Sequence, residues 1–507
     1  MSAYFVLPDF LPALPEIFLL GMALVVLLIS IGQKPIHRTL AFYLTQLTLL
    51  FVFVLVVGGS RTEAVYTFAN MFVRDLFADF LKAMVCFSVM MTLAYSRRYL
   101  AERTAIPVGE YCALSLFATL GMMAMISANH FLPLYLGLEI LSLSLYALTA
   151  LNRSNAAASE AAMKYFVLGA LASGFLLYGM SLIYGMTGSL NISEISILVE
   201  YWKQNSEVMD SLPLVFGLVF IVAGLGFKMG AVPFHMWLPD VYHGAPTAAT
   251  LFIAAAPKLA AFAMLARLLL GALFPLLPDW QPMLMLLAVL SMGLGNIVAV
   301  AQHNIKRMLA YSAISHMGFV LLALCSGLGT GEEDPLTTMQ LAYGSALFYL
   351  VAYVLATLAI FGLIMMLSRA GFESDRLEDF KGLNQRSPWL AALMMLLMLS
   401  LAGIPILVGF FAKFAVLTAV VLVGHYWLAV LAVMFSLIGA FYYLRVVKLM
   451  YFDEAPANAP PIEASVPIRI LFSVNSLAIL LIGIFPQTVT VICTYVADSL
   501  LFRIPLF

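Results

Sequence analysis

The feature that most constrains this 507-residue chain is a series of apolar segments, each long enough to cross a membrane. A helix rises ~1.5 Å per residue, so about 20 apolar residues cross the ~30 Å hydrocarbon layer of a bilayer. The fourteen segments of this kind are 10–31, 39–58, 76–95, 110–128, 131–150, 162–185, 212–232, 248–274, 281–301, 308–327, 338–367, 388–420, 427–447 and 466–485. The sequence therefore predicts an all-α, polytopic membrane protein with about fourteen transmembrane helices.

The composition agrees with a lipid environment and excludes several classes of function. Hydrophobic residues make up 64% of the chain and charged residues only 10%, whereas a soluble domain carries about 25% charged residues. The net charge of -1 provides no basic surface for nucleic acid. The four cysteines lie in apolar segments without CxxC spacing, and the sequence has no P-loop and no GxGxxG motif. We therefore expect no cofactor and no metal in this chain.

Basic residues are unequally distributed between the two sides of the predicted bundle. If the loop between the first two segments is on the inner side, the inner loops carry fifteen Lys and Arg residues and the outer loops carry four. The inner residues are Lys34, Arg38, Arg97, Arg98, Arg103, Arg153, Lys306, Arg307, Arg369, Arg376, Lys381, Arg386, Arg445, Lys448 and Arg469, and the outer ones are Arg61, Arg74, Lys203 and Arg503. Cytoplasmic loops of membrane proteins are enriched in Lys and Arg. We therefore expect a multi-pass protein of the bacterial inner membrane with both termini in the periplasm.

Two of the predicted helices are interrupted by glycine and proline. The seventh runs into Gly230 and Pro233, and the twelfth, which would be 33 residues long, contains Gly403 and Pro405. Proline lacks an amide donor and clashes with the preceding turn, so both helices should break at these points. Broken backbone at membrane depth is tolerated where it faces protein or a hydrated cavity, and it marks the transport site in carriers built from inverted repeats. Segments four to eight and nine to thirteen can form two such repeats.

Some charged residues within the predicted spans have a structural explanation. Lys82 follows Asp79 by one turn, and an i,i+3 pair partly neutralises both charges. Arg267 lies near the outer end of the eighth helix, where its long side chain can reach the headgroups. Glu16 opens the first helix and is expected at the interface. Lys164 lies near the inner end of the sixth helix, where an interfacial position and a role in transport both stay open.

Four other ionisable residues are harder to explain by packing. Glu139 lies at the middle of the fifth segment with no basic residue within one turn. Lys228 and Lys413 lie close to the two helix breaks, and Lys258 directly follows Pro257. A charge at the bilayer centre costs at least ~2.5–3.5 kcal/mol. Desolvation disfavours the charged form of a lysine and a nearby carboxylate favours it, so a lysine whose distance from Glu139 changes would take up and release a proton. We interpret the four residues as a path for protons or ions.

Two histidines can extend this path, because a neutral imidazole both donates and accepts hydrogen bonds. His235 lies at the inner end of the seventh helix and His316 lies within the tenth. A histidine on an apolar helix is often a core residue whose hydrogen bonds are satisfied. For His316 the core and relay interpretations therefore stay open.

Five motifs concentrate around these residues. They are GLEILSL at 137–143, GFK at 226–228, VPFHMWLPDVYHGAP at 232–246, NIKRMLAYSAISH at 304–316, and LAGIP at 401–405 followed by Gly409 and Lys413. Together they resemble the antiporter-like membrane subunits of respiratory complex I. The resemblance covers segments four to thirteen.

The resemblance implies a fold with two inverted five-helix repeats containing broken helices, within a proton-pumping membrane arm. In that family a fifth-helix glutamate, here Glu139, pairs with the lysine of the broken seventh helix, here Lys228. An eighth-helix lysine, here Lys258, relays protons to the twelfth-helix lysine, here Lys413, from which they leave. Lys164 stands where the family has a sixth-helix lysine. The resemblance also implies that NADH, FMN, iron–sulfur clusters and quinone are used by other subunits of the complex.

Two departures from other members of that family indicate the N type, which is the homologue of mitochondrial chain 2. The M type has a glutamate where this chain has Lys413. The L type continues into a long lateral helix, whereas only about twenty residues follow Pro486 here, and their mixed composition favours an interfacial helix. The expected partners are the M-type subunit, the small K-type subunit and the lipid bilayer.

We expect four regions along the chain. Residues 1–105 hold three N-terminal helices, 106–275 the first repeat, 276–451 the second repeat, and 452–507 a final spanning helix with a short periplasmic interfacial tail. Two other classes of protein stay open. A subunit of a multi-subunit sodium/proton antiporter or of a membrane-bound hydrogenase shares the lysine and glutamate motifs, and a structural membrane scaffold would carry the charges without using them.

Overall fold

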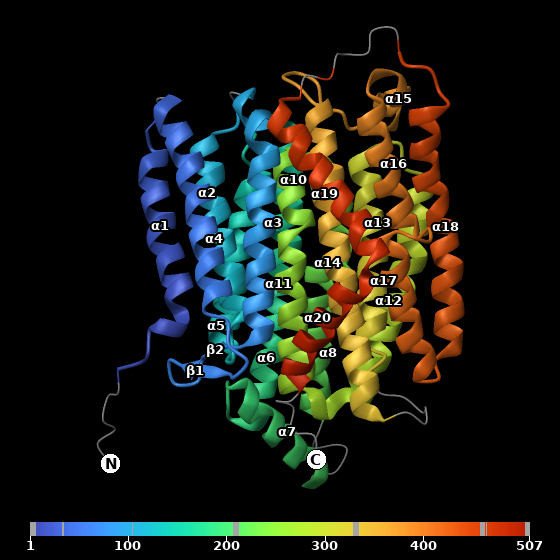
Figure 1. The fold of residues 1–507 in the computed structure, drawn as a ribbon. Helices are drawn as coiled ribbons and strands as arrows, with labels where there is room; N and C mark the ends of the chain where they lie inside the picture. The colour runs from blue at the N-terminus through green and yellow to red at the C-terminus, as the bar shows by residue number, and fades with distance from the viewer. Residues whose placement is uncertain are drawn as a thin grey trace.

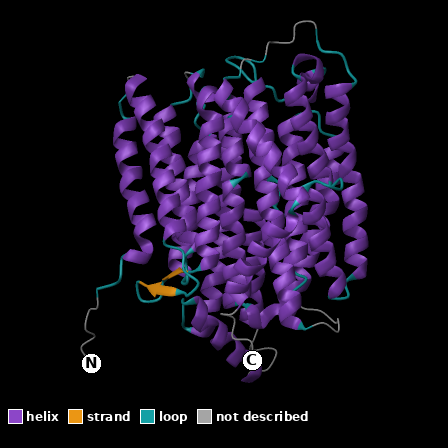
Figure 2. Cartoon of the chain, in the orientation of Figure 1, coloured by secondary structure: helices purple, strands orange, loops and turns teal. Residues whose placement is uncertain are grey.

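The computed structural model describes residues 7–32, 35–103, 105–205, 212–327, 334–456, 462 and 464–501. Most of these residues form helices that run side by side in one bundle (Figure 1). A small antiparallel sheet of β1 (Val65–Thr67) and β2 (Phe72–Arg74) lies at the end of the bundle where α1 begins (Figure 2). We call this end the terminal face, and the opposite end, where α15 lies, the basic face.

The helices have the following bounds. The α-helices are α1 (Leu14–Ser30), α2 (Pro35–Gly58), α3 (Leu76–Ala101), α4 (Val108–Ile126), α5 (Phe131–Thr149), α6 (Ala156–Thr187), α7 (Ile192–Asn205), α8 (Leu212–Met229), α9 (Trp237–Gly244), α10 (Thr247–Ala254), α11 (Ala256–Leu265), α12 (Leu277–Val300), α13 (Ile305–Leu324), α14 (Pro335–Leu367), α15 (Leu383–Arg386), α16 (Pro388–Ala402), α17 (Val408–Leu422), α18 (Tyr426–Tyr451), α19 (Val466–Ile484) and α20 (Pro486–Leu501). Short 3-10 helices are η1 (Leu11–Ala13), η3 (Phe274–Leu276) and η4 (Leu377–Phe380), and η2 (Ala266–Ala272) is a π-helix that continues α11.

The number of membrane crossings agrees with the prediction from hydropathy. Thirteen helices in the described part of the chain are long and apolar enough to cross a bilayer. The shorter apolar helices α16 and α17 follow one another and together make one further crossing, which brings the number of crossings in the described chain to fourteen. The division of the chain into two repeats stays a prediction.

The predicted helix breaks are confirmed. The seventh crossing stops at Met229 and resumes at Trp237, with Gly230 in a left-handed conformation (φ 75°). The twelfth stops at Ala402, with Gly403 at φ 89°, and resumes at Val408. The eighth is interrupted at Ala255, two residues before Pro257, where α10 gives way to α11. Figure 2 shows loop segments at mid-height of the bundle, where backbone carbonyls are left without the amide partners of a continuous helix.

Two elements differ from the sequence-based expectation. The polar connection 186–211 contains helix α7, whose Ile192, Ile195 and Val199 are buried along one side. The segment after Pro486 was expected at the membrane interface, but α20 runs obliquely from the end of α19 back along α14 to the terminal face (Figure 1). Thr490 and Thr494 do not need lipid headgroups as hydrogen-bond partners, because their hydroxyls donate to backbone carbonyls one turn earlier in α20.

The partners of three charged residues also differ from expectation. Lys82 pairs with Glu16 at 2.5 Å rather than with Asp79, and both side chains are buried. Glu16 is therefore not an interfacial residue, since it neutralises a lysine inside the bundle.

Arg267 does not extend to the headgroups, because it is buried and donates to Asp75 at 2.7 Å. Asp75 also caps the start of α3 by accepting from the Ala78 amide. The pair thus ties η2 to the start of α3. Lys34 and Arg503, counted above among the basic residues, lie outside the described residues.

Candidate functional site

The break in the seventh crossing is occupied by the ammonium group of Lys258. Lys258 lies in α11, is 2% exposed, and donates from Nζ to the carbonyl of Met229 at 2.8 Å. Met229 is the last residue of α8, so its carbonyl has no amide partner within the helix. The Trp237 ring, at the start of α9, faces the same ammonium group at 5.7 Å. The two ends of the broken helix therefore hold a buried cation that belongs to the neighbouring crossing.

Lys228 lies on the last turn of α8 and points toward α5. Its Nζ donates to the Ser142 hydroxyl at 2.8 Å. Ser142 follows Glu139 by three residues, so the lysine meets α5 one turn away from the glutamate. The Glu139 charge acts on Lys228 through space, while the buried Oε1 of Glu139 accepts no hydrogen bond from the described residues. The lysine and the glutamate of the expected pair are therefore close to each other, but Lys228 donates to Ser142, whose hydroxyl in turn donates to the Leu138 carbonyl.

These two lysines share a small cavity. Lys228, Lys258, Ser142, Tyr165 and Trp237 are among the residues that line it. Its volume of about 20 Å³ is enough for one water molecule. We call it the first cavity.

The break in the twelfth crossing holds a second ammonium group, which is partly buried. Lys413 lies in α17 and donates from Nζ to the carbonyls of Leu401 and Ala402, both at 3.0 Å. These are the last residues of α16, whose carbonyls are again without amide partners. The Ser436 hydroxyl of α18 accepts a third hydrogen bond at 2.8 Å. Three acceptors therefore satisfy the three N–H groups of this lysine.

His316 is fixed between two tyrosines. One ring nitrogen, Nδ1, lies 2.7 Å from the Tyr349 hydroxyl, and the other, Nε2, lies 2.9 Å from the Tyr443 hydroxyl. Tyr443 also contacts the Ser312 hydroxyl. His316, Tyr349, Tyr353, Ser400 and Lys413 line a second small cavity, of about 20 Å³. We call it the second cavity, and it places the histidine and the twelfth-helix lysine at one site.

Lys164 lies apart from both cavities. Its side chain is 44% exposed and forms ion pairs with Glu160 and Asp240, each at 2.8 Å. Asp240 also accepts from Arg307 at 2.8 Å. Lys164 thus belongs to a surface ion-pair network. His235 lies in the break between α8 and α9, and its buried Nδ1 accepts no hydrogen bond from the described chain.

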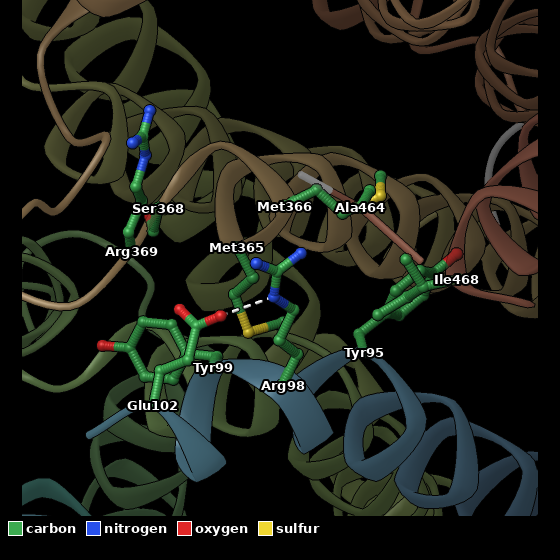
Figure 3. A pocket seen from close by; sticks show the side chains of 10 residues that line it. All are labelled: Tyr95, Arg98, Tyr99, Glu102, Met365, Met366, Ser368, Arg369, Ala464 and Ile468. Atoms are coloured by element: carbon green, nitrogen blue, oxygen red, sulfur yellow. Dashed lines mark hydrogen bonds and ion pairs between the residues drawn. The ribbon is translucent and has the colours of Figure 1, made fainter. Parts of the chain in front are cut away.

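A third pocket opens at the basic face between the ends of α3 and α14 and the start of α19 (Figure 3). Arg98 of α3 and Glu102, which directly follows this helix, form an ion pair there, and Ser368 and Arg369 follow the end of α14. None of the predicted site residues lines this pocket. The candidate path is therefore built from the two buried cavities.

Several polar partners at these sites were missed from the sequence. Ser142 and Ser436 accept from Lys228 and Lys413, and Tyr349 and Tyr443 hold His316. Ser142 could have been identified from the sequence, because it lies three residues after Glu139 and therefore on the same helix face. Ser436 and the two tyrosines lie in helices far away in sequence, so no spacing rule identifies them.

The fold agrees with comparisons to known proteins. Residues 128–439 match the model of the family described as NADH:quinone oxidoreductase/Mrp antiporter, TM. A chain of respiratory complex I from Thermus thermophilus is 30% identical over 94% of this chain and 98% of its own length, with a TM-score of 0.77. A chain of the Mrp complex from Dietzia sp. has a TM-score of 0.82 over 97% of this chain and 98% of its own, and its 19% identity indicates a shared fold alone. The class is thus that of the antiporter-like membrane proteins.

Relatives of higher identity define the family within this class. The NADH-quinone oxidoreductase subunit N of Azoarcus sp. is 56% identical over 97% of this chain and 98% of its own length. The protein described here belongs to the NADH-quinone oxidoreductase subunit N family.

Proposed function

We propose that this chain carries protons across the bacterial inner membrane as a membrane-arm subunit of NADH:quinone oxidoreductase. The relay consists of Glu139, Lys228, Lys258 and Lys413, with His316 beside the last lysine. The observation that carries this proposal is the placement of a lysine at the breaks of the seventh and twelfth crossings, where free carbonyls accept from its ammonium group.

The lysines are suited to hold a proton temporarily. Carbonyl acceptors favour the ammonium form of Lys258 and Lys413, while burial favours the neutral amine. The two effects oppose each other, so a modest change in the surroundings changes the proton occupancy. A single water in each cavity can pass a proton to or from the lysine, since the first cavity contains Lys228 and Lys258 and the second contains Lys413.

Glu139 sets the charge of the first cavity in this proposal. When Glu139 is ionised, its charge favours the ammonium form of Lys228. If Lys228 moves away from α5, or if Glu139 takes up a proton, this support is lost and Lys228 releases its proton toward Lys258. Until then, the hydrogen bond to the Ser142 hydroxyl holds Lys228 close to Glu139. His316 then exchanges protons with Lys413 in the second cavity.

Orientation and partners are part of the same proposal. The basic face lies in the cytoplasm, so both termini are periplasmic, and the M-type and K-type subunits are the neighbours in the membrane. NADH, FMN, iron–sulfur clusters and quinone act on other subunits. The four native cysteines are buried, so a cysteine introduced at the 81%-exposed Arg153 should react with an impermeant thiol reagent from the cytoplasm. Reaction from the periplasm instead would contradict the proposed orientation.

The relay is tested by a matched pair of lysine substitutions in the intact complex. Lys258→Met removes a buried lysine of the proposed path, and Lys164→Met removes an exposed lysine outside the cavities. Protons taken up per NADH oxidised are measured in reconstituted vesicles, and assembly is checked on a native gel. We expect a lower proton yield for Lys258→Met and a wild-type yield for Lys164→Met. Equal yields in both assembled variants would contradict the relay.

A further inference from the structure

Tyr242, in α9, has a buried hydroxyl that the relay described so far does not use. Its side chain is fully buried, and the hydroxyl makes no hydrogen bond of ordinary geometry with the described part of the chain. Leaving a buried hydroxyl unpaired is energetically unfavourable. Tyr111 shows the usual arrangement, since its equally buried hydroxyl donates to the Ala248 carbonyl at 3.1 Å. The Tyr242 hydroxyl thus lacks a backbone acceptor of the kind that fixes the Tyr111 hydroxyl.

The neighbours of Tyr242 connect the two cavities. Tyr242 interacts electrostatically with Tyr165 and with Tyr353. The hydroxyl of Tyr353 lies near the hydroxyl of Tyr242. Tyr165 lines the first cavity, together with Lys228 and Lys258. Tyr353 lines the second, together with His316 and Lys413, and its ring centroid lies 5.4 Å from that of His316. Tyr242 therefore has one neighbour in each cavity.

The surroundings of Tyr242 are otherwise apolar or fixed. Its ring packs against Phe361 of α14 at 6.2 Å. Its own carbonyl is already engaged, because it accepts from the Thr250 hydroxyl at 3.1 Å. The hydroxyl is thus the polar atom of this residue that stays available between the cavities.

We propose that Tyr242 carries the proton from the first cavity to the second, so that Tyr165, Tyr242 and Tyr353 form a hydroxyl bridge between Lys258 and Lys413. This inference rests on the proposed function, because it needs both lysines to exchange protons. The bridge crosses from α6 through α9 to α14, and it therefore joins the helices of the two predicted repeats.

The transfer leaves the tyrosine chemically unchanged. The Tyr242 oxygen accepts a proton from the Tyr165 side while its own O–H bond breaks and that proton passes to the Tyr353 hydroxyl. One O–H bond forms as another breaks, and the hydroxyl then rotates back to its starting position. Over the whole bridge Lys258 changes from ammonium to amine, and Lys413 or His316 gains the proton. No oxidant, reductant or tyrosinate is required.

The decisive variant is Tyr242→Phe, which removes the hydroxyl and keeps the ring. Because this hydroxyl has no fixed partner, its loss should leave folding and assembly intact. We expect protons taken up per NADH in vesicles to fall to the level of Lys258→Met, with NADH oxidation by an artificial acceptor unchanged. Tyr111→Phe is the matched control, since it deletes a buried hydroxyl outside both cavities, and its proton yield should stay at the wild-type value.

The outcomes separate this inference from the proposed function. A wild-type proton yield in Tyr242→Phe, beside a low yield in Lys258→Met, would overturn the bridge and leave the lysine relay standing. A wild-type yield in both variants would overturn the relay itself. If Tyr242→Phe does not assemble, Tyr353→Phe removes the next hydroxyl of the bridge, and a normal proton yield in that variant overturns the inference.

Discussion

The first and second cavities both place a lysine ammonium group at a helix break but surround it differently. In the first, Lys258 reaches the carbonyl at the end of α8 from a neighbouring crossing. In the second, Lys413 belongs to the broken crossing itself and turns back to the last two carbonyls of α16. Each break thus supplies carbonyl acceptors for an ammonium group, although the lysine comes from a different place in the chain.

The two cavities differ most in the neighbouring group that can change the protonation of their lysines. A carboxylate, Glu139, acts on Lys228 beside the first cavity, whereas His316 and its two tyrosines line or adjoin the second. A carboxylate changes a lysine's proton affinity through its charge, while a neutral imidazole can exchange a proton directly. We therefore propose that the first cavity is controlled electrostatically and that the second transfers protons through hydrogen bonds.

The largest effect is expected from changes at Lys413. Arginine stays protonated in proteins and cannot release a proton, although it keeps the positive charge. Lys413→Arg should therefore assemble and pump as poorly as Lys413→Ala, while Lys413→Glu, which can titrate, should retain more activity than Lys413→Ala. Protons per NADH in vesicles give the measurement. Pumping by Lys413→Arg at the wild-type level would show that the second cavity needs only a fixed charge.

A somewhat smaller effect is expected from Glu139→Gln. The substitution removes the charge that supports the ammonium form of Lys228 but leaves every lysine in place. The proton yield should fall, and electron transfer from NADH to an artificial acceptor should continue, because the relay residues carry no redox group. Glu139→Asp, which keeps the charge on a shorter side chain, should restore part of the yield. If the Gln variant pumps normally, the electrostatic control assigned to the first cavity is wrong.

The smallest effects are expected from the two serines, and they should be unequal. Ser142 accepts a hydrogen bond from Lys228 with no backbone carbonyl of the described residues sharing that ammonium group, whereas Ser436 shares the ammonium group of Lys413 with two backbone carbonyls. Ser142→Ala should therefore slow pumping several-fold, because it removes a hydrogen bond to a charged group. Ser436→Ala should slow it less. The reverse order, measured as initial rates of proton uptake, would contradict the comparison.

Much of the fold was predictable from the sequence because each physical cause is local. Apolar runs of about 20 residues define the crossings, and Gly230, Pro233, Gly403 and Pro405 mark the breaks. The helix α7 was missed, since its short buried face was hidden in a polar connection. The path of α20 was predicted wrongly, because hydroxyls that bond within their own helix look polar in the sequence.

The sequence by itself determined which residues carry charge inside the membrane, because an ionisable side chain in an apolar run is visible without any structure. Tertiary structure decided which atoms meet those charges. Lys82 selects Glu16 over the nearer Asp79, and Arg267 selects Asp75, 192 residues away. Likewise, Lys258 finds the carbonyl of Met229, and Tyr242 comes to lie between two cavities. A buried charge must find its partners wherever the packing of helices brings acceptors together, and that packing is not encoded in the spacing of any single segment.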